Sequence, residues 1–321
     1  MQYDIFNGDA DGICALIQLR LNNPVQDAVL ITGIKRHINL LDDLCVTACD
    51  TVTVLDVSLK KNADGLTHIL NQGAYVFYVD HHEPGVIPKH PNLKTLINTA
   101  PDTCTGLIVD TFLGGKHREW AITAAYGDNL IGPAEQLSKA MALTYDQSAL
   151  LKTLGTCINY NSYGDDLSDL HIEPRHLYLQ LCQYRSPFGF ILDNKSIYDV
   201  LLSGYQNDLN DTVLIKPDYE TNNVCVYILP DTPGSRRISG VFSNNLAHES
   251  PKKAHAVLTY NKQGDFKVSV RAPLNNPVGA DELCALFPTG GGRKRAAGIN
   301  HLPLDQLATF IAQFEKNIPK H

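Results

Sequence analysis

The triplet Asp80-His81-His82 places a carboxylate and two imidazoles in consecutive positions of the chain. Residues 74–79, which precede it, are aromatic and β-branched, a composition typical of a buried strand, and residues 83–85 (EPG) end any regular structure after it. In an open parallel α/β sheet, ligands bind beyond the carboxyl ends of the strands. The triplet is therefore a candidate metal or catalytic site at a strand end.

A second acidic strand end occurs near the N-terminus. Residues 3–6 are a predicted strand that runs into the turn NGDADG and then into an amphipathic helix. Asp9 and Asp11 can face one point in this turn, because the flanking glycines let the backbone bend tightly. An Asp-Gly turn with a helix N-cap explains one carboxylate. It does not explain two carboxylates together with Asn7.

Two further carboxylates end apolar elements. Asp56 follows a predicted strand over residues 51–55, and Asp128 follows a predicted helix over residues 117–127. Each position by itself is consistent with helix-cap or turn chemistry. Together with the turn and the triplet, they supply oxygen ligands and two imidazoles. This donor set suits a pair of Mn²⁺ or Mg²⁺ ions better than a thiolate-bound zinc.

The elements that must position these residues alternate between strand and helix. Repeated strand-turn-helix units predict an α/β fold whose N-terminal domain has a mostly parallel sheet with flanking helices. From residue 224 the pattern changes, and we expect β structure over residues 224–230, 236–247 and 253–273, with a hairpin at KQGD. This second part is predicted to be a smaller α/β domain. The expected boundaries are residues 1–185 for the metal-binding domain, 186–210 for a linker with a connector helix, and 211–321 for the substrate-binding domain.

Composition narrows the class of protein. The 321 residues favour two domains, and the net charge of −7 favours a small anionic ligand over a long nucleic-acid strand. We find no apolar run of the length that a membrane span needs, and residues 1–12 lack the features of a signal peptide. The eight cysteines are scattered without a C-x-x-C pair, which predicts reduced thiols in a cytoplasmic protein.

Four short segments occur in a fixed order: NGDADG (7–12), VLDVS (54–58), VDHH (79–82) and YGDN (126–129). They resemble the four successive motifs of the DHH phosphoesterase superfamily, which includes single-strand exonucleases and short-oligonucleotide hydrolases. The glycine run at residues 290–292 resembles the GGGH-type signature of the DHH-associated C-terminal domain. The resemblance covers the whole chain. It implies an active site in the cleft between the two domains.

The resemblance also implies roles for the candidate residues. Asp56 would bridge two metal ions, and His82 would approach the substrate phosphate or the ligand shell. Asp80 would orient a histidine ring. Many members have a histidine or an aspartate as an early ligand in the first motif, whereas this chain offers Asn7 or Ile5 in that neighbourhood, and the carbonyl oxygen of Asn7 is a weaker ligand. The implied metal ligands are Asn7, Asp9, Asp11, Asp56, His81 and Asp128, and the implied catalytic residues are Asp80, His81 and His82.

Substrate recognition is predicted mainly in the second half. Backbone N–H groups of the glycine run can approach a phosphate closely, and arginine at position 293, where the family usually has histidine, is a bidentate phosphate partner. A polar-aromatic loop over residues 159–164 could stack a base. The candidate substrate-binding residues are Asn161, Tyr163, Arg236, Arg237, Arg271, Gly290, Gly291, Gly292, Arg293 and Arg295.

These observations predict a manganese-dependent phosphodiesterase with two ions, Mg²⁺ being an alternative metal. Its expected substrates are short linear 5′-phosphorylated oligonucleotides, best a dinucleotide such as pGpG from cyclic di-GMP turnover, cut to mononucleotides by two-metal hydroxide attack. The alternatives are a single-strand exonuclease, a 3′-phosphoadenosine 5′-phosphate phosphatase and a non-catalytic nucleotide sensor. We expect no long nucleic acid and no membrane as partners, and either a monomer or a homodimer.

Overall fold

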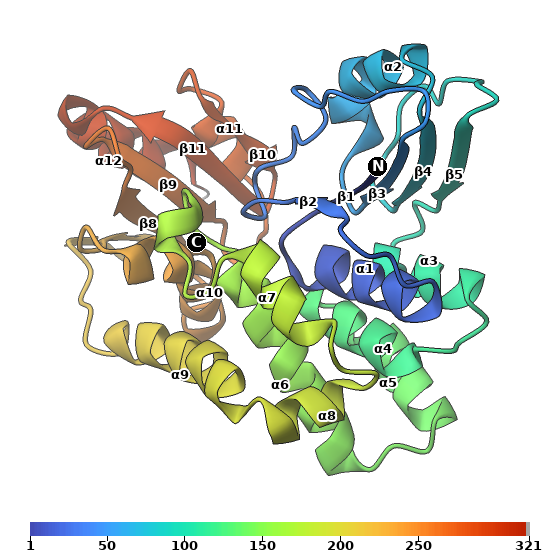
Figure 1. Ribbon diagram of the computed structural model, residues 1–321. Coiled ribbons are helices and arrows are strands. Elements are labelled where there is room, and N and C mark those ends of the chain that lie inside the picture. The colour runs from blue at the N-terminus through green and yellow to red at the C-terminus, as the bar shows by residue number, and fades with distance from the viewer. Residues whose placement is uncertain (319–321) are drawn as a thin grey trace. The chain divides into compact units, whose positions relative to one another are not determined.

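The computed structural model describes residues 1–318. Its chain divides into two compact units, Met1–Tyr205 and a second unit that begins at Gln206. Each unit is built around its own sheet (Figure 1). The predicted linker, residues 186–210, contains two helices, α8 (Pro187–Asp193) and α9 (Lys195–Asp211), and the division between the units falls within α9.

The sheet of the first unit has five parallel strands in the order β2-β1-β3-β4-β5. The registers pair Phe6 with Leu55 and Leu55 with Val79, so the carboxyl ends of the three central strands are level with one another. The mostly parallel sheet expected from the sequence is confirmed. Its strands are β1 (Gln2–Phe6), β2 (Val29–Ile31), β3 (Thr51–Leu55), β4 (Tyr75–Asp80) and β5 (Leu93–Ile97).

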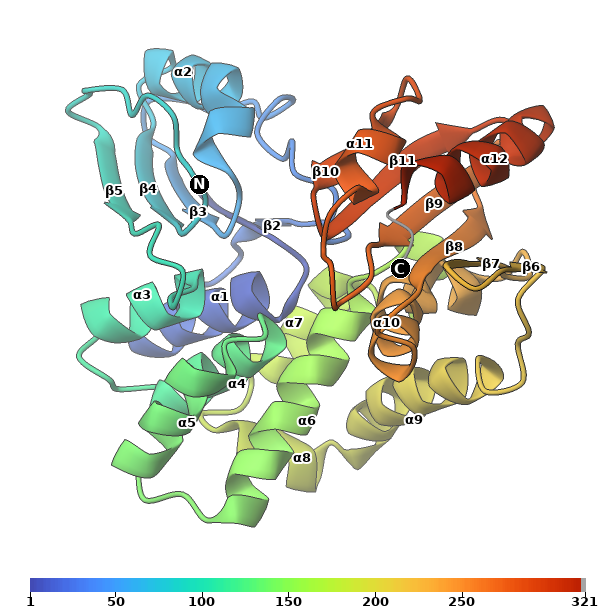
Figure 2. The same cartoon turned by 180° about the vertical axis from the view of Figure 1, so that it is seen from behind.

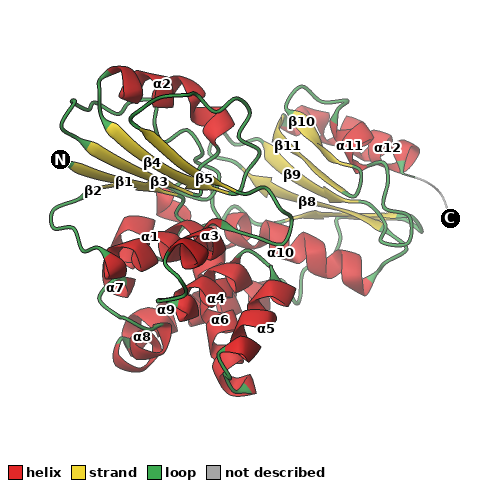
Figure 3. Ribbon diagram, turned by 90° about the vertical axis from the view of Figure 1, so that its right-hand side faces the viewer, coloured by secondary structure: helices red, strands yellow, loops and turns green. Residues whose placement is uncertain are grey.

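Helices cover both faces of this sheet. Figure 3 shows α2 on one face, and α1 and α3 on the other with the remaining helices beyond them. Buried hydrophobic side chains from both faces form two clusters, one of which includes Phe6, Ile13 and Trp120. The helices are α1 (Ala10–Asn22), α2 (Ala63–Asn71), α3 (Thr105–Phe112), α4 (Arg118–Gly127), α5 (Ile131–Ala140), α6 (Tyr145–Asn161) and α7 (Pro174–Leu181), followed by α8 and α9.

The second unit contains a mixed six-stranded sheet in the order β10-β11-β9-β8-β7-β6. All neighbouring strands are antiparallel except β7 and β8. Helix α10 covers one face, and α11 and α12 cover the other (Figure 2). The elements are β6 (Tyr219–Glu220), β7 (Val224–Ile228), α10 (Pro233–Glu249), β8 (Ala254–Tyr260), β9 (Phe266–Arg271), α11 (Ala280–Cys284), β10 (Gly290–Arg293), β11 (Ala296–Leu302) and α12 (Leu307–Asn317).

The prediction of β structure over residues 236–247 is wrong, because this segment lies inside α10. Thr232 caps the helix by accepting a hydrogen bond from the backbone N–H of Ser235, and Pro233 stands at its first turn. The apolar residues Ile238, Phe242 and Leu246 are buried and spaced by four, which is the helical period. The hairpin predicted at KQGD is confirmed between β8 and β9.

Among residues 1–318, the structure contains no helix that is both long and apolar enough to cross a membrane. All eight cysteines are free thiols, as the sequence predicted.

Candidate metal centre

The triplet Asp80-His81-His82 begins at the last residue of β4, where the sheet's register places it beside the end of β3. Asp80 is fully buried. Its Oδ1 accepts a hydrogen bond from the backbone N–H of His81 at 2.9 Å and lies 2.7 Å from Nδ1 of His82. Its Oδ2 is also buried and has no hydrogen-bond partner among the described residues. One carboxylate therefore holds one imidazole and keeps an unused acceptor.

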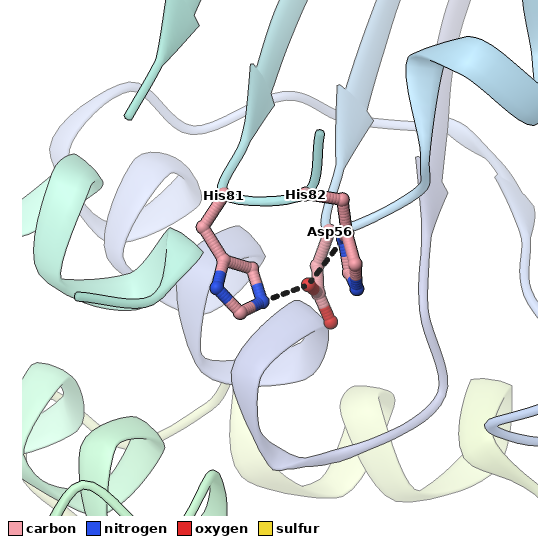
Figure 4. Close-up of side chains that lie close together, drawn as sticks. All are labelled: Asp56, His81 and His82. Carbon is pink, nitrogen blue, oxygen red and sulfur yellow. Dashed lines mark ion pairs between the residues drawn. The ribbon is translucent and has the colours of Figure 1, made fainter. Parts of the chain in front are cut away.

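Asp56 directs its carboxylate toward the two histidines from the neighbouring strand end. Its backbone has a φ of 56°, which is uncommon for a residue other than glycine, and its N–H donates to the carbonyl of Val79 at 3.1 Å. Strained backbone of this kind is frequent at functional sites. Oδ1 lies 3.4 Å from Nε2 of His81 and 3.9 Å from Nδ1 of His82 (Figure 4).

Asp9 begins helix α1 as its N-cap. Its Oδ1 accepts hydrogen bonds from the backbone N–H groups of Asp11 and Gly12 at 3.0 and 3.2 Å. Gly12 is required there, because a Cβ atom at this position would lie 2.2 Å from the carbonyl oxygen of Asn7. The turn therefore fixes Asp9 and Asp11 next to each other at the end of β1.

Asp11 is bound by the start of helix α3. Its two oxygens accept hydrogen bonds from the backbone N–H groups of Thr105 at 2.8 Å and Gly106 at 2.7 Å. The N-terminal end of a helix stabilises a negative charge, which favours a carboxylate at this place. Oδ2 of Asp11 lies 4.0 Å from Nε2 of His81, and Oδ2 of Asp128, at the end of α4, lies 3.9 Å from the same nitrogen.

His81 thus stands at the centre of the assembled side chains. Two sets of three potential ligands share it, and within each set one ligand atom per residue lies within 4.8 Å of the others. Neither set includes Asp9. The described residues supply carboxylate oxygens and imidazole nitrogens at this point, a donor set suited to Mn²⁺ or Mg²⁺. The sets are Asp56, His81 and His82, and Asp11, His81 and Asp128.

The site contains several carboxylates that lie close together and are mostly buried. Burial raises the pKa of Asp56 well above its usual range, and the neighbouring carboxylates of Asp11 and Asp9 raise it further. Burial likewise raises the pKa of Asp128 to about 6, with Asp11 adding to the effect. Carboxylates that resist ionisation because they repel one another are the groups that a divalent cation stabilises best.

Lys35 is part of the site, and the sequence analysis did not identify it. Its Nζ donates to Oδ2 of Asp9 at 2.6 Å and to Oδ1 of Asn159 at 2.9 Å, and lies 3.7 Å from Oδ1 of Asp128. Burial raises the pKa of Asp9, but attraction and hydrogen bonding to Lys35, together with the backbone N–H of Gly12, leave this pKa below its usual value. Lys35 lies in the long connection between β2 and β3, where no local pattern marks it.

Asn7 is held by hydrogen bonds within the turn that follows β1. Its Oδ1 accepts a hydrogen bond from the backbone N–H of Asp9 at 3.2 Å, and its Nδ2 donates to the backbone carbonyl of Lys35 at 3.3 Å. The oxygen proposed as a metal ligand is therefore used within the turn.

Two residues of the predicted polar-aromatic loop have internal roles. Asn161 is fully buried at the end of α6, and its amide both donates to and accepts from the backbone of Ile172. It is a structural residue, because none of its polar atoms reaches solvent. The hydroxyl of Tyr163 accepts from Nδ2 of Asn159 at 3.0 Å, and its ring centre lies 6.0 Å from Nζ of Lys35.

The second unit places four of the predicted substrate residues on one strand, β10. Gly290, Gly291, Gly292 and Arg293 pair with β11. Gly290 allows the strand to pass α11, because a Cβ atom there would lie 1.8 Å from the carbonyl oxygen of Cys284.

Cations gather beside this strand. The side chains of Arg293, Lys294 and Arg295 are exposed. Arg271 lies on β9 next to the same hairpin, and burial, together with the nearby charge of Arg295, lowers its pKa. Cations placed close to one another are typical of an anion site. Nε of Arg271 also donates to Oδ1 of Asn244 at 2.7 Å.

The Arg236-Arg237 pair has acidic partners within the second unit. Arg237 is buried, and its guanidinium donates to both oxygens of Asp208 at 2.7 and 2.9 Å. Arg236 donates to Oδ1 of Asp231 at 2.6 Å. These contacts give Arg237 a bidentate ion pair with a carboxylate of its own unit.

No family model and no curated protein matches this sequence significantly. Solved structures do. An exonuclease RecJ bound to manganese has a TM-score of 0.62 at 16% identity, over 98% of this chain and 89% of that chain. RecJ from Thermus thermophilus in complex with Mn²⁺ gives 0.63 at 17% identity, and this chain spans about half of its length, 51%. A pGpG-specific phosphodiesterase, PggH from Vibrio cholerae, gives 0.56 at 15% identity, over 99% of this chain and 100% of that chain.

The likeness extends over both units, because it covers 98% and 99% of this chain. The chain therefore has the two-part α/β fold of the RecJ exonuclease and of the pGpG-specific phosphodiesterase, which is the fold that its resemblance to the DHH phosphoesterase superfamily implies.

Proposed function

We propose that this protein is a manganese-dependent phosphodiesterase of the DHH superfamily that hydrolyses short linear 5′-phosphorylated oligonucleotides. The observation that carries the proposal is the convergence of acidic and imidazole side chains from four separate segments on His81. Such a convergence of like charges is costly unless a cation is bound among them. Mg²⁺ is the alternative ion.

The side chains present fit a divalent metal ion. They offer carboxylate oxygens and imidazole nitrogens, and burial together with the neighbouring negative charges raises the pKa values of Asp56 and Asp128. When bound, the ion lowers the pKa of a coordinated water and polarises a phosphate oxygen. The residues that would hold it are Asp11, Asp56, His81 and Asp128.

His82 is suited to donate a proton on the side of the reacting phosphate. The hydrogen bond from its Nδ1 to Asp80 raises the pKa of His82, which favours the imidazolium form. The other ring nitrogen, Nε2, then carries a proton that it can give to the leaving oxygen. Asp80 fixes the ring and its tautomer, and because Asp80 is fully buried it does so without competition from water.

The best substrate is proposed to be a dinucleotide such as pGpG, the linear product of cyclic di-GMP opening. The net charge of −7 disfavours a long polyanion, whereas Arg271, Arg293 and Arg295 could bind one terminal phosphate. The fold shared with the pGpG-specific phosphodiesterase over its full length adds support.

The test is hydrolysis by the purified protein with Mn²⁺ of a panel of 5′-phosphorylated dinucleotides, alongside a single-stranded 20-mer. We expect mononucleotide products, and dinucleotide turnover at least about tenfold faster than that of the 20-mer. His81→Ala should be inactive with its circular dichroism unchanged, and His90→Ala, outside the site, should retain activity. The proposal would be overturned if the folded, Mn²⁺-loaded protein cleaved none of the dinucleotides of the panel.

A second candidate is a single-strand exonuclease, which the likeness to RecJ favours. It predicts equal or faster turnover of the 20-mer, with mononucleotides released successively from one end. The same assay therefore separates the two functions, and adding a 5′-hydroxyl dinucleotide shows whether the terminal phosphate matters.

A further inference from the structure

The two sides of the site differ in how their carboxylates are used. On one side, Asp56 and Asp128 face the imidazole of His81. On the other, both oxygens of Asp9 already have donors. Oδ1 accepts two backbone N–H groups as a helix cap, and Oδ2 accepts the ammonium of Lys35. Asp9 thus pairs its charge with a lysine, and it belongs to neither of the ligand sets around His81.

Lys35 is held in this position by its surroundings. Its backbone N–H donates to the carbonyl of Ser162 at 3.0 Å, and its backbone carbonyl accepts from Asn7. Its ammonium has a second acceptor in Asn159, whose amide is in turn fixed by the hydroxyl of Tyr163. A lysine bound at its backbone and at its ammonium by defined partners is built into the site. It is not a surface lysine that happens to swing inward.

Asn7 gives a second observation on the Asp9 side. The motif resemblance implies a histidine or an aspartate as an early ligand in the first motif, where this chain offers Asn7 or Ile5. The chain has an amide instead, and that amide binds the backbone of Asp9 and of Lys35. Two features therefore occur together beside Asp9. The amide of Asn7 is a weak metal ligand, and the ammonium of Lys35 supplies a positive charge.

We propose that the Lys35 ammonium takes the place of one of the two divalent cations implied by the motifs, so that this chain binds a single Mn²⁺, at the side chains around His81. The inference rests on the proposed function only in taking Mn²⁺ as the metal. A lysine ammonium is a compact point charge, and it repels a second ion from Asp9 while neutralising the carboxylate that such an ion would need. Lys35 is then a fixed positive charge beside the metal ion.

The experiment is Mn²⁺ titration of the nucleotide-free protein by calorimetry, followed by electron paramagnetic resonance of the loaded protein. We expect about one ion per chain and the six-line signal of an isolated Mn²⁺. Two ions only about 3.5–4 Å apart would couple magnetically and lose that signal. Two ions per wild-type chain with a coupled spectrum would overturn the inference.

Variants make the assignment specific to Lys35. Lys35→Ala, and more strongly Lys35→Ala combined with Asn7→His, should raise the stoichiometry to about two ions and broaden the spectrum. Asp9→Asn should leave the stoichiometry at about one Mn²⁺ per chain, because Asp9 pairs with Lys35. Asp56→Asn should lower the stoichiometry, because Asp56 is one of the proposed ligands. Lys61→Ala, an exposed lysine, is the matched control. Folded Lys35 variants that remain at one ion would refute the role of Lys35, and circular dichroism establishes their folding.

The outcome is separable from that of the hydrolysis assay, because stoichiometry is measured without a nucleotide. A protein that binds one Mn²⁺ but cleaves no phosphodiester would refute the proposed function and leave this inference standing. A protein that binds two Mn²⁺ ions and cleaves the dinucleotide would refute this inference and leave the proposed function standing.

Discussion

The strand-end site of the first unit and the glycine-rich strand of the second unit use charge in opposite ways. Around His81 the carboxylates are buried and held by backbone groups, as Asp11 is by the first N–H groups of α3. Around Arg293 the cations are exposed on a two-stranded hairpin at a sheet edge. Fixed geometry is what a metal site requires, whereas exposed cations can adjust to a phosphate. Substitutions around His81 should therefore abolish activity, whereas substitutions around Arg293 should reduce it only in part.

Asp56→Asn should have the largest effect. It removes the carboxylate shared between His81 and His82 while keeping nearly the same shape. Because even residues that only orient metal ligands cost about 10–100-fold, loss of this oxygen should lower turnover more than about a hundredfold. Turnover of the dinucleotide and Mn²⁺ affinity measure it. Asp42→Asn, on the surface, is the control, and a variant with wild-type activity would remove Asp56 from the site.

Asp80→Asn should have the next largest effect, about 10–100-fold on Mn²⁺ affinity or on turnover. The amide no longer supports the imidazolium of His82, whose pKa Asp80 raises. The pH profile of turnover is the informative measurement. The pH at which turnover falls because His82 loses its proton should be lower in the variant. An unchanged profile would mean that Asp80 acts only through packing.

Arg293→Ala should produce a smaller, graded change. Loss of one exposed guanidinium should raise KM about tenfold, equivalent to about 1.4 kcal/mol, with kcat nearly unchanged. Steady-state kinetics on dinucleotides with and without a 5′-phosphate measure it, and the variant should lose preference for the phosphorylated one. Lys252→Ala, another exposed cation of the second unit, should show no such loss of preference. A fall in kcat with KM unchanged would contradict the view that Arg293 only binds the substrate.

The smallest effect concerns the stability of the metal-free protein. The pKa of Asp128 is about 6 in the folded protein, above its ordinary value of about 3.9. Between these values the folded state binds more protons than the unfolded state, so this contribution to stability declines as pH rises through about 6. In EDTA, Tm should be roughly 2–5 °C higher at pH 5 than at pH 7.5. Asp128→Asn should reduce that difference, and Mn²⁺ should restore Tm at pH 7.5.

Local sequence patterns predicted the parts of the site that lie at element ends. The acids after β1 and β3 and the triplet after β4 lie where parallel strands must end together, so their convergence followed from the strand assignments. The β prediction over residues 236–247 failed because the buried residues of α10 repeat every four positions, a period hidden by intervening small polar residues. Strand β5 was not predicted, because its residues are only half buried and lack alternation.

By itself, the sequence determined the α/β class, the four acidic segments and the donor types suited to a divalent metal, because these depend on neighbours along the chain. Only the tertiary structure decided that Asp9 faces Lys35, that Asn161 is a buried structural residue and that Arg237 binds Asp208. Each of these is a contact between segments far apart in sequence. The physical reason is that charge pairing and burial are properties of positions in space, which local spacing does not specify.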